Sequence, residues 1–141
     1  AGQSPSGEIR VLVVDDEPEL LSMFAEILTD RGFQVRTAAN GREALERLDE
    51  QPAQVVITDL GMPDLSGWEL IAAARKKLPN ARYILTTGWT DSSLDVDLKA
   101  RGVDHVLPKP VEVQSLMDLM EHIRSSLETV RKNQIETPSQ S

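Results

Sequence analysis

The chain has 141 residues, about the length of one ordinary domain, and its hydrophobic fraction of 40% and charged fraction of 27% lie close to globular averages. It contains no cysteine, which excludes disulfides, thiolate nucleophiles and zinc–thiolate sites, and its two isolated histidines do not have metal-ligand spacing. The net charge of -8 argues against direct nucleic-acid binding, and without a long apolar run or a secretion signal we expect a cytoplasmic protein that makes no membrane contact.

Short apolar runs alternate with helix-period segments along most of the chain. Residues 1–8 are small and polar, and we interpret them as a linker or as residues left from cloning. Five strands are predicted, four of them rich in β-branched residues, at 9–14, 34–38, 54–58, 82–86 and 103–107. Such alternation is typical of βα units around a parallel sheet, so we expect one α/β domain over residues 9–127.

Three helix positions are marked by local chemistry. An apolar stripe at helical spacing predicts the first helix, and it is formed by Leu20, Phe24, Ile27 and Leu28. Gly32 is expected to end this helix. Asn40 with Glu43, and Ser66 with Glu69, each place a capping side chain three residues before an acid, which predicts the starts of two more helices.

The last two helices rest on weaker signals. Over residues 94–98 apolar and charged residues alternate with a period of two, and we expect a helix there only because parallel strands need a crossover. A helix from about Glu112 carries a heptad-like stripe of Leu116, Met120, Ile123, Leu127 and Val130. This stripe is interpreted either as a continuing core face or, beyond Ser125, as a dimer contact or a connection to a neighbouring domain. Residues 128–141 are expected to form a helix extension and a disordered tail.

Five residues whose side chains can react, bind a metal or carry charge stand where predicted strands end or just beyond them: Asp15, Asp16, Asp59, Thr87 and Lys109. In an open α/β sheet, ligands bind at the carboxyl ends of the strands. A single Asp at such a place is often only a helix cap, and a single Lys is often only solvated. Three carboxylates at one edge repel one another unless a cation is present, so together these residues indicate a functional site.

The residue types at this edge favour phosphoryl chemistry with a hard cation. Three Asp without His or Cys form an oxygen-only site, which suits Mg²⁺ better than zinc or copper. Lys109 would add a second positive charge, and Thr87 a neutral hydrogen-bond donor. A carboxylate is an accepted nucleophile for phosphoryl transfer, and no separate general base is required.

Four short motifs in this order and spacing resemble the receiver domain of bacterial response regulators and hybrid histidine kinases, over about residues 8–127. They are Asp15-Asp16, Asp59-Leu60-Gly61-Met62-Pro63 with Gly67, Thr86-Thr87-Gly88, and Lys109-Pro110. The resemblance implies a flavodoxin-like, doubly wound five-stranded parallel sheet in the order 2-1-3-4-5 with five flanking helices.

The resemblance also implies a role for each site residue. Asp59 would be the phosphoacceptor, Asp16 and Asp59 would bind Mg²⁺ directly, Asp15 would bind it through water, the carbonyl of Gly61 would be a further ligand, Thr87 would be the switch hydroxyl, and Lys109 would pair with the phosphate. The peptide bond before Pro110 would be cis.

One position departs from the family pattern. The family usually has Tyr or Phe three residues before the Lys, and Val106 stands there in this chain. A swinging aromatic ring therefore cannot act at this position, and His105 and Trp89 are candidate substitutes. Trp89 follows Gly88 near the predicted site, so we also hypothesise that its ring shields an acyl phosphate from water.

We expect a phosphorelay receiver that takes its phosphoryl group from a histidine kinase or a histidine phosphotransfer domain and then switches an unidentified output partner. Such a receiver catalyses its own phosphorylation without being a turnover enzyme. We expect it to belong to a hybrid histidine kinase, with a stand-alone response regulator or a phosphorylation-independent docking module as alternatives. An Asp-nucleophile phosphatase is disfavoured because Gly61 stands where its acid/base belongs, and a nucleotide or flavin binder because the acids at 15–17 would repel phosphate.

Overall fold

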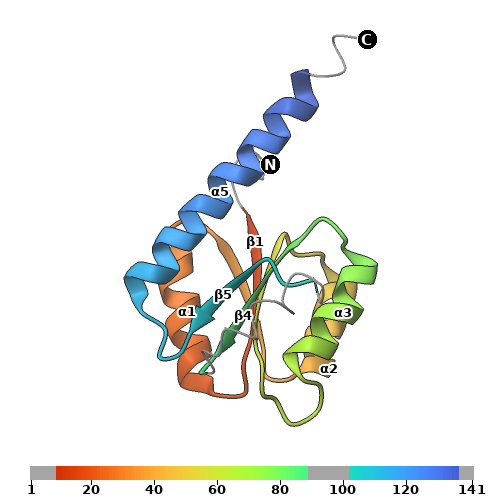
Figure 1. Cartoon of the computed structure of the whole chain (residues 1–141), viewed down its shortest axis with the longest axis vertical. Helices are drawn as coiled ribbons and strands as arrows, with labels where there is room; N and C mark the ends of the chain where they lie inside the picture. The colour runs from red at the N-terminus through yellow and green to blue at the C-terminus, as the bar shows by residue number, and fades with distance from the viewer. Residues whose placement is uncertain (1–8, 89–101, 137–141) are drawn as a thin grey trace. The chain divides into compact units, whose positions relative to one another are not determined.

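The computed structural model describes residues 9–88 and 102–136, and from residue 129 onward only the backbone. Its centre is a five-stranded parallel sheet in the order β2-β1-β3-β4-β5, as predicted (Figure 1). The strands are β1 (Arg10–Val14), β2 (Gln34–Ala38), β3 (Val55–Asp59), β4 (Arg82–Thr87) and β5 (His105–Pro108). All five overlap the predicted runs, and their ends shift by no more than two residues.

The central strands are buried over most of their length because helices cover both faces of the sheet. Every residue of β3 is buried, and so are the last four residues of β1. Figure 1 shows α1 (Pro18–Asp30) on one face, with α2 (Gly41–Glu50) and α3 (Gly67–Lys77) side by side on the other. The helix expected at 94–98 lies outside the described residues, as does Trp89.

The capping signals read from the sequence are confirmed by hydrogen bonds. The side-chain oxygen of Asn40 accepts from the backbone N–H of Glu43 at 2.8 Å. Ser66 and Glu69 form a reciprocal capping box at the start of α3. Gly32 follows α1 with a φ of 92°, a left-handed conformation that favours glycine.

The last helix, α5 (Val113–Glu136), belongs to a separate compact unit of residues 112–141. The first part of its predicted apolar stripe is buried, since Leu116, Met120 and Ile123 are at most 1% exposed. Leu127 is half-buried, and the side chain of Val130 lies outside the described residues. The role of the stripe beyond Ser125 therefore stays a prediction. Within the described ranges, no helix is long and apolar enough to cross a membrane.

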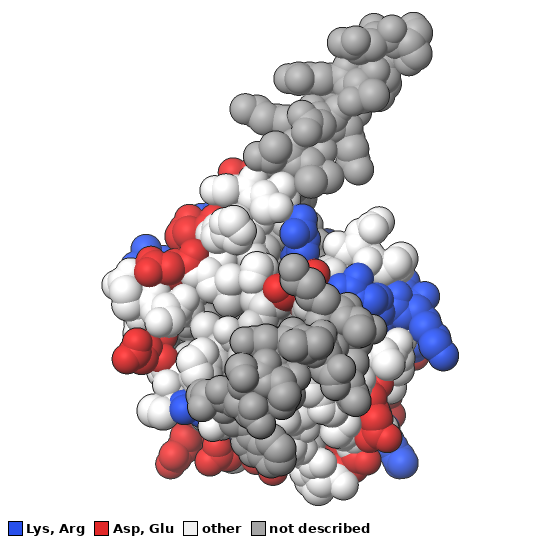
Figure 2. Space-filling model, in the orientation of Figure 1, with Lys and Arg blue, Asp and Glu red and all other residues white. Residues whose placement is uncertain are grey.

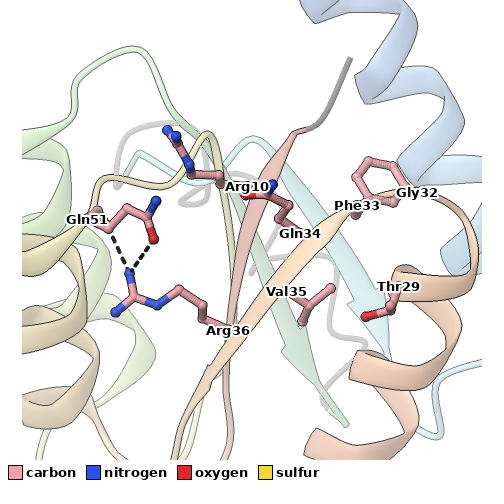
Figure 3. A pocket seen from close by; sticks show the side chains of 8 residues that line it. All are labelled: Arg10, Thr29, Gly32, Phe33, Gln34, Val35, Arg36 and Gln51. Atoms are coloured by element: carbon pink, nitrogen blue, oxygen red, sulfur yellow. Dashed lines mark hydrogen bonds between the residues drawn. The ribbon is translucent and has the colours of Figure 1, made fainter. Parts of the chain in front are cut away.

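A pocket of about 520 Å³ lies at the amino-terminal edge of the sheet, lined from β1, β2 and the ends of α1 and α2 (Figure 3). Figure 3 shows the Arg36 and Gln51 side chains pointing toward each other at one side of the pocket, and the Arg36 guanidinium donates to Gln51 Oε1 at 3.2 Å. Arg10 also lines the pocket. The predicted site residues stand at the carboxyl ends of the strands, the opposite edge of the parallel sheet, so this pocket does not contain them.

Candidate functional site

The three predicted acids meet at the carboxyl edge of the sheet. β1 and β3 are neighbours in register, with Val14 opposite Thr58, so Asp15 and Asp59 follow on adjacent strands. Each of Asp15, Asp16 and Asp59 offers a carboxylate oxygen, and these oxygens all lie within 4.8 Å of one another. Asp15 and Asp59 are buried, at 1% and 8% exposure, whereas Asp16 is exposed. Figure 2 shows acidic side chains along the lower rim of the part of the molecule that holds the sheet, and β4 and β5 point toward this rim in Figure 1.

Lys109 brings a positive charge into this cluster. It follows directly after β5, and its Nζ lies 2.8 Å from Asp59 Oδ1 and 3.4 Å from Asp15 Oδ2. The backbone N–H of Lys109 donates to the carbonyl oxygen of Thr87 at 2.9 Å, which ties the end of β4 to the lysine. The peptide bond between Lys109 and Pro110 is cis. The cation is therefore held against both buried carboxylates.

The pKa values of Asp15 and Lys109 are both raised, for different reasons. Burial raises the pKa of Asp15, and the backbone N–H of Glu17 and the charge of Lys109 only partly counteract this. Burial lowers the pKa of Lys109, but its hydrogen bond to Asp59 and the charges of Asp15 and Asp59 outweigh that effect and raise it. Lys109 therefore remains positively charged at neutral pH.

The remaining predicted site residues lie on or beside the same edge. Thr87 ends β4 and is buried at 2% exposure. Gly61 lies two residues beyond Asp59, is exposed, and has no atom of the described residues within 4 Å of the position that a Cβ would take. The backbone N–H of Leu60 donates to the Thr86 carbonyl at 3.0 Å, which fixes the start of the loop that carries Gly61.

The candidate switch residues of β5 lie on an edge strand of the sheet. Val106 pairs with Leu85 of β4, is half-buried and packs against the main hydrophobic core. His105 pairs with Ile84 and is also half-buried. These positions agree with contact to β4, but a part in switching stays a prediction for both residues, as it does for Trp89.

The chemistry of the cluster fits a hard cation. Among the described residues, the acid cluster consists of carboxylates alone, with no imidazole in it. One ammonium group faces three carboxylates, so negative charge remains in excess at the cluster. Oxygen ligands with excess negative charge are what Mg²⁺ prefers.

One further residue close to the site had not been singled out in the sequence. Asp64, in the loop between β3 and α3, accepts backbone hydrogen bonds from Gly41 and Arg42 at the start of α2. An Asp after a Pro reads simply as a loop residue, and its partners lie more than twenty residues away in the chain. Local sequence patterns give no signal for such a contact.

Comparison with known proteins places the geometry in context. The family model for the response regulator receiver domain matches residues 11–121. The transcriptional regulatory protein KdpE of Mycobacterium tuberculosis is 44% identical over 100 residues, which cover 71% of this chain and 44% of KdpE. The sensor kinase CckA of Brucella abortus is 34% identical over 113 residues, which cover 79% of this chain and 12% of the kinase.

Solved structures agree with the sequence comparison. The chemotaxis protein CheY4 of Vibrio cholerae superimposes with a TM-score of 0.78 at 30% identity, over 82% of this chain and 98% of CheY4. The chain spans less than half the length of the first curated relatives that it matches. The match therefore concerns the receiver unit that those proteins share with this chain.

Proposed function

The chain belongs to the family of response regulator receiver domains, and we propose that it accepts a phosphoryl group on Asp59 from a phosphohistidine donor in the presence of Mg²⁺. One observation carries this proposal. The carboxylate of Asp59 lies in a cluster of three Asp and is paired with Lys109 at 2.8 Å, so a nucleophile and a cation for phosphoryl oxygens stand together.

In the proposed reaction, an oxygen of the Asp59 carboxylate forms a bond to phosphorus while the bond between phosphorus and the donor imidazole nitrogen breaks. The imidazole keeps the electron pair and takes its proton from solvent. Asp15, Asp16, Asp59 and the Gly61 carbonyl would hold Mg²⁺, which when bound neutralises charge on the phosphoryl oxygens. Lys109 would exchange its pairing with Asp59 for pairing with these oxygens.

Thr87 is proposed to couple phosphorylation to the partner surface. Its carbonyl already accepts from the N–H of Lys109, so the hydroxyl-bearing end of β4 and the phosphate-pairing lysine are joined by one hydrogen bond. The phosphoryl group adds a charge of about -1.5 to -2, which biases two arrangements already present in the ensemble. The donor partner would be a histidine kinase or a histidine phosphotransfer domain.

The relatives support a response regulator better than the hybrid histidine kinase that was expected from the sequence. KdpE, a transcriptional regulator, is 44% identical, whereas the sensor kinase CckA is 34% identical. CheY4, a chemotaxis protein, is matched over 98% of its own length. We therefore favour the response regulator alternative as the kind of protein that carries this domain.

Phosphorylation by a small-molecule donor tests the proposal. The protein is incubated with acetyl phosphate and Mg²⁺, and intact-mass spectrometry should show a phosphoryl adduct that is absent in Asp59→Asn and strongly reduced when Mg²⁺ is chelated. A phosphorylation-independent docking module would remain unmodified in all samples. If the wild type gains no adduct, or if Asp59→Asn gains the same adduct, the proposed function is wrong.

A further inference from the structure

The loop of residues 60–66 carries Gly61, whose carbonyl is a proposed metal ligand, and its two ends are well fixed. The N–H of Leu60 is bonded to β4, and the N–H of Gly67 donates back to the Leu60 carbonyl at 2.8 Å. Gly61 itself is exposed and has open space around it. The next residue, Met62, is buried in the main hydrophobic core, so the position of the Gly61 carbonyl depends on Met62 and on what holds the rest of the loop.

Asp64 holds the middle of this loop against another element. Its Oδ1 accepts from the N–H of Gly41 at 3.1 Å, and its Oδ2 accepts from the N–H of Arg42 at 2.9 Å. These N–H groups are the first two of α2, and helices leave such groups without partners of their own. The hydrogen bond from the backbone N–H of Arg42 lowers the pKa of Asp64, burial opposes this, and the hydrogen bond from Gly41 adds to the lowering, so the carboxylate is ionised at neutral pH.

The start of α2 also lies in direct contact with the loop. A Cβ added to Gly41 would come within 2.6 Å of the Leu65 Cβ, a distance that real Cβ atoms do not show. Gly41 therefore allows the close approach that the two hydrogen bonds of Asp64 require. The loop is clamped to α2 by a carboxylate with both oxygens engaged.

The first turn of α2 has a second cap that does not involve the loop. Asn40 accepts from the N–H of Glu43 at 2.8 Å, and Asn40 belongs to the chain that enters α2. Asn40 and Asp64 thus satisfy different N–H groups of the same helix end, and of these two caps Asp64 is the one that belongs to the loop of Gly61. A substitution of Asn40 therefore removes a cap of α2 alone, whereas a substitution of Asp64 removes a cap and also the hydrogen bonds that hold the loop.

From these contacts we propose that Asp64 is a positioning residue for the metal, which holds the Gly61 loop in its binding conformation by clamping it to the first turn of α2. This inference rests on the proposed function, because it assumes that the acid cluster and the Gly61 carbonyl bind Mg²⁺. Residues that orient metal ligands from outside the coordination shell commonly have large effects on metal affinity. Asp64 would act on the backbone of the loop that carries the Gly61 carbonyl rather than on a ligand side chain.

Calorimetric Mg²⁺ titration of the wild-type protein, Asp64→Ala and Asn40→Ala tests the proposal. Asp64→Ala should raise the Mg²⁺ dissociation constant about tenfold, whereas Asn40→Ala should leave it unchanged. Both variants should unfold at lower urea concentration, because each removes a cap of α2. Asn40→Ala is therefore the matched control for lost helix stability.

Two further measurements keep the test informative if Asp64→Ala is poorly folded. Asp64→Asn retains one acceptor oxygen and should bind Mg²⁺ with an affinity between those of the wild type and Asp64→Ala. In metal-free protein, amide hydrogens of residues 61–65 should exchange faster in Asp64→Ala than in Asn40→Ala.

The positioning role of Asp64 and the proposed function of the chain can fail separately. An equal Mg²⁺ affinity in Asp64→Ala and wild type, or an equal loss in Asn40→Ala, would overturn the positioning role while leaving the proposed function intact. A wild-type protein that neither binds Mg²⁺ nor becomes phosphorylated would refute the proposed function itself, and the positioning role with it.

Discussion

Tyr83, the only tyrosine of the chain, should make the protein sensitive to alkaline pH. It lies in β4 with 0% exposure, its hydroxyl donates to the Leu78 carbonyl at 2.8 Å, and the Arg75 guanidinium carbon lies 4.7 Å from its ring centroid. Burial raises its pKa from 10.0 to about 12, against the opposing charge of Arg75. The fold therefore favours the neutral phenol.

The size and sign of the effect follow from this pKa. Because the folded pKa lies above the unfolded one, the stability that Tyr83 contributes is complete below about pH 10 and is lost as the pH rises toward 12. One pH unit of difference corresponds to about 1.4 kcal/mol. At pH 11 the loss should be about 1.4 kcal/mol, and it should approach about 3 kcal/mol at still higher pH.

Urea unfolding at pH 9 and pH 11 measures this loss, with Tyr83→Phe as the control. The control loses the hydrogen bond to Leu78, about 1 kcal/mol at either pH, but has no phenol to ionise. Other groups titrate equally in both proteins, so the wild type should lose about 1.4 kcal/mol more than the variant between the two pH values.

An equal loss of unfolding free energy in both proteins between pH 9 and pH 11 would show that burial does not raise the pKa of Tyr83. The same conclusion follows if tyrosinate absorbance develops with a midpoint near pH 10 while circular dichroism shows the protein still folded. Since the chain has a single tyrosine, that absorbance has only one source.

Three substitutions near the site give further tests. Gly67→Ala places a Cβ 2.6 Å from the Asp59 carbonyl oxygen and should lower the unfolding free energy by about 1–3 kcal/mol. Gly88→Ala places a Cβ with no atom of the described residues within 4 Å and should change the unfolding free energy little in the same urea assay. Lys109→Met removes the cation beside Asp59 and should slow phosphorylation by acetyl phosphate about 100-fold or more in a quenched time course, and an unchanged rate would contradict its role. Thr87→Ala should still be phosphorylated but should bind its partner equally in both forms, and a phosphorylation-dependent affinity in this variant would refute the switch role.

Much of the fold follows from local sequence because most of the strands and three of the helices carry a local sequence signal. The β-branched runs gave strands whose ends shifted by at most two residues, and the pairs Asn40–Glu43 and Ser66–Glu69 cap α2 and α3 as their spacing predicted. The parallel topology then brings the strand-end acids together without any further information. The sheet order itself came from the family resemblance.

Contacts between distant loops were not predictable in the same way. The carboxylate of Asp64 bonds to the start of α2, and Arg75 bonds to the Gly102 carbonyl at 2.8 Å. Neither contact has a sequence period or a fixed spacing, since each depends on where two loops or helices meet after the sheet has formed. A loop Asp and a helix-end Arg look like ordinary surface residues until the tertiary structure is known.

The distance of 94 residues along the chain between Asp15 and Lys109 has a consequence for synthesis at the ribosome. All three acids emerge before the lysine that pairs with two of them, because Lys109 follows β5, the last strand of the sheet. A nascent chain, or a truncated product ending at residue 88, therefore carries the three carboxylates without their internal counter-charge. Until β5 joins the edge of the sheet, the charge of Lys109 is missing from the acid cluster, and cations from solution can take its place.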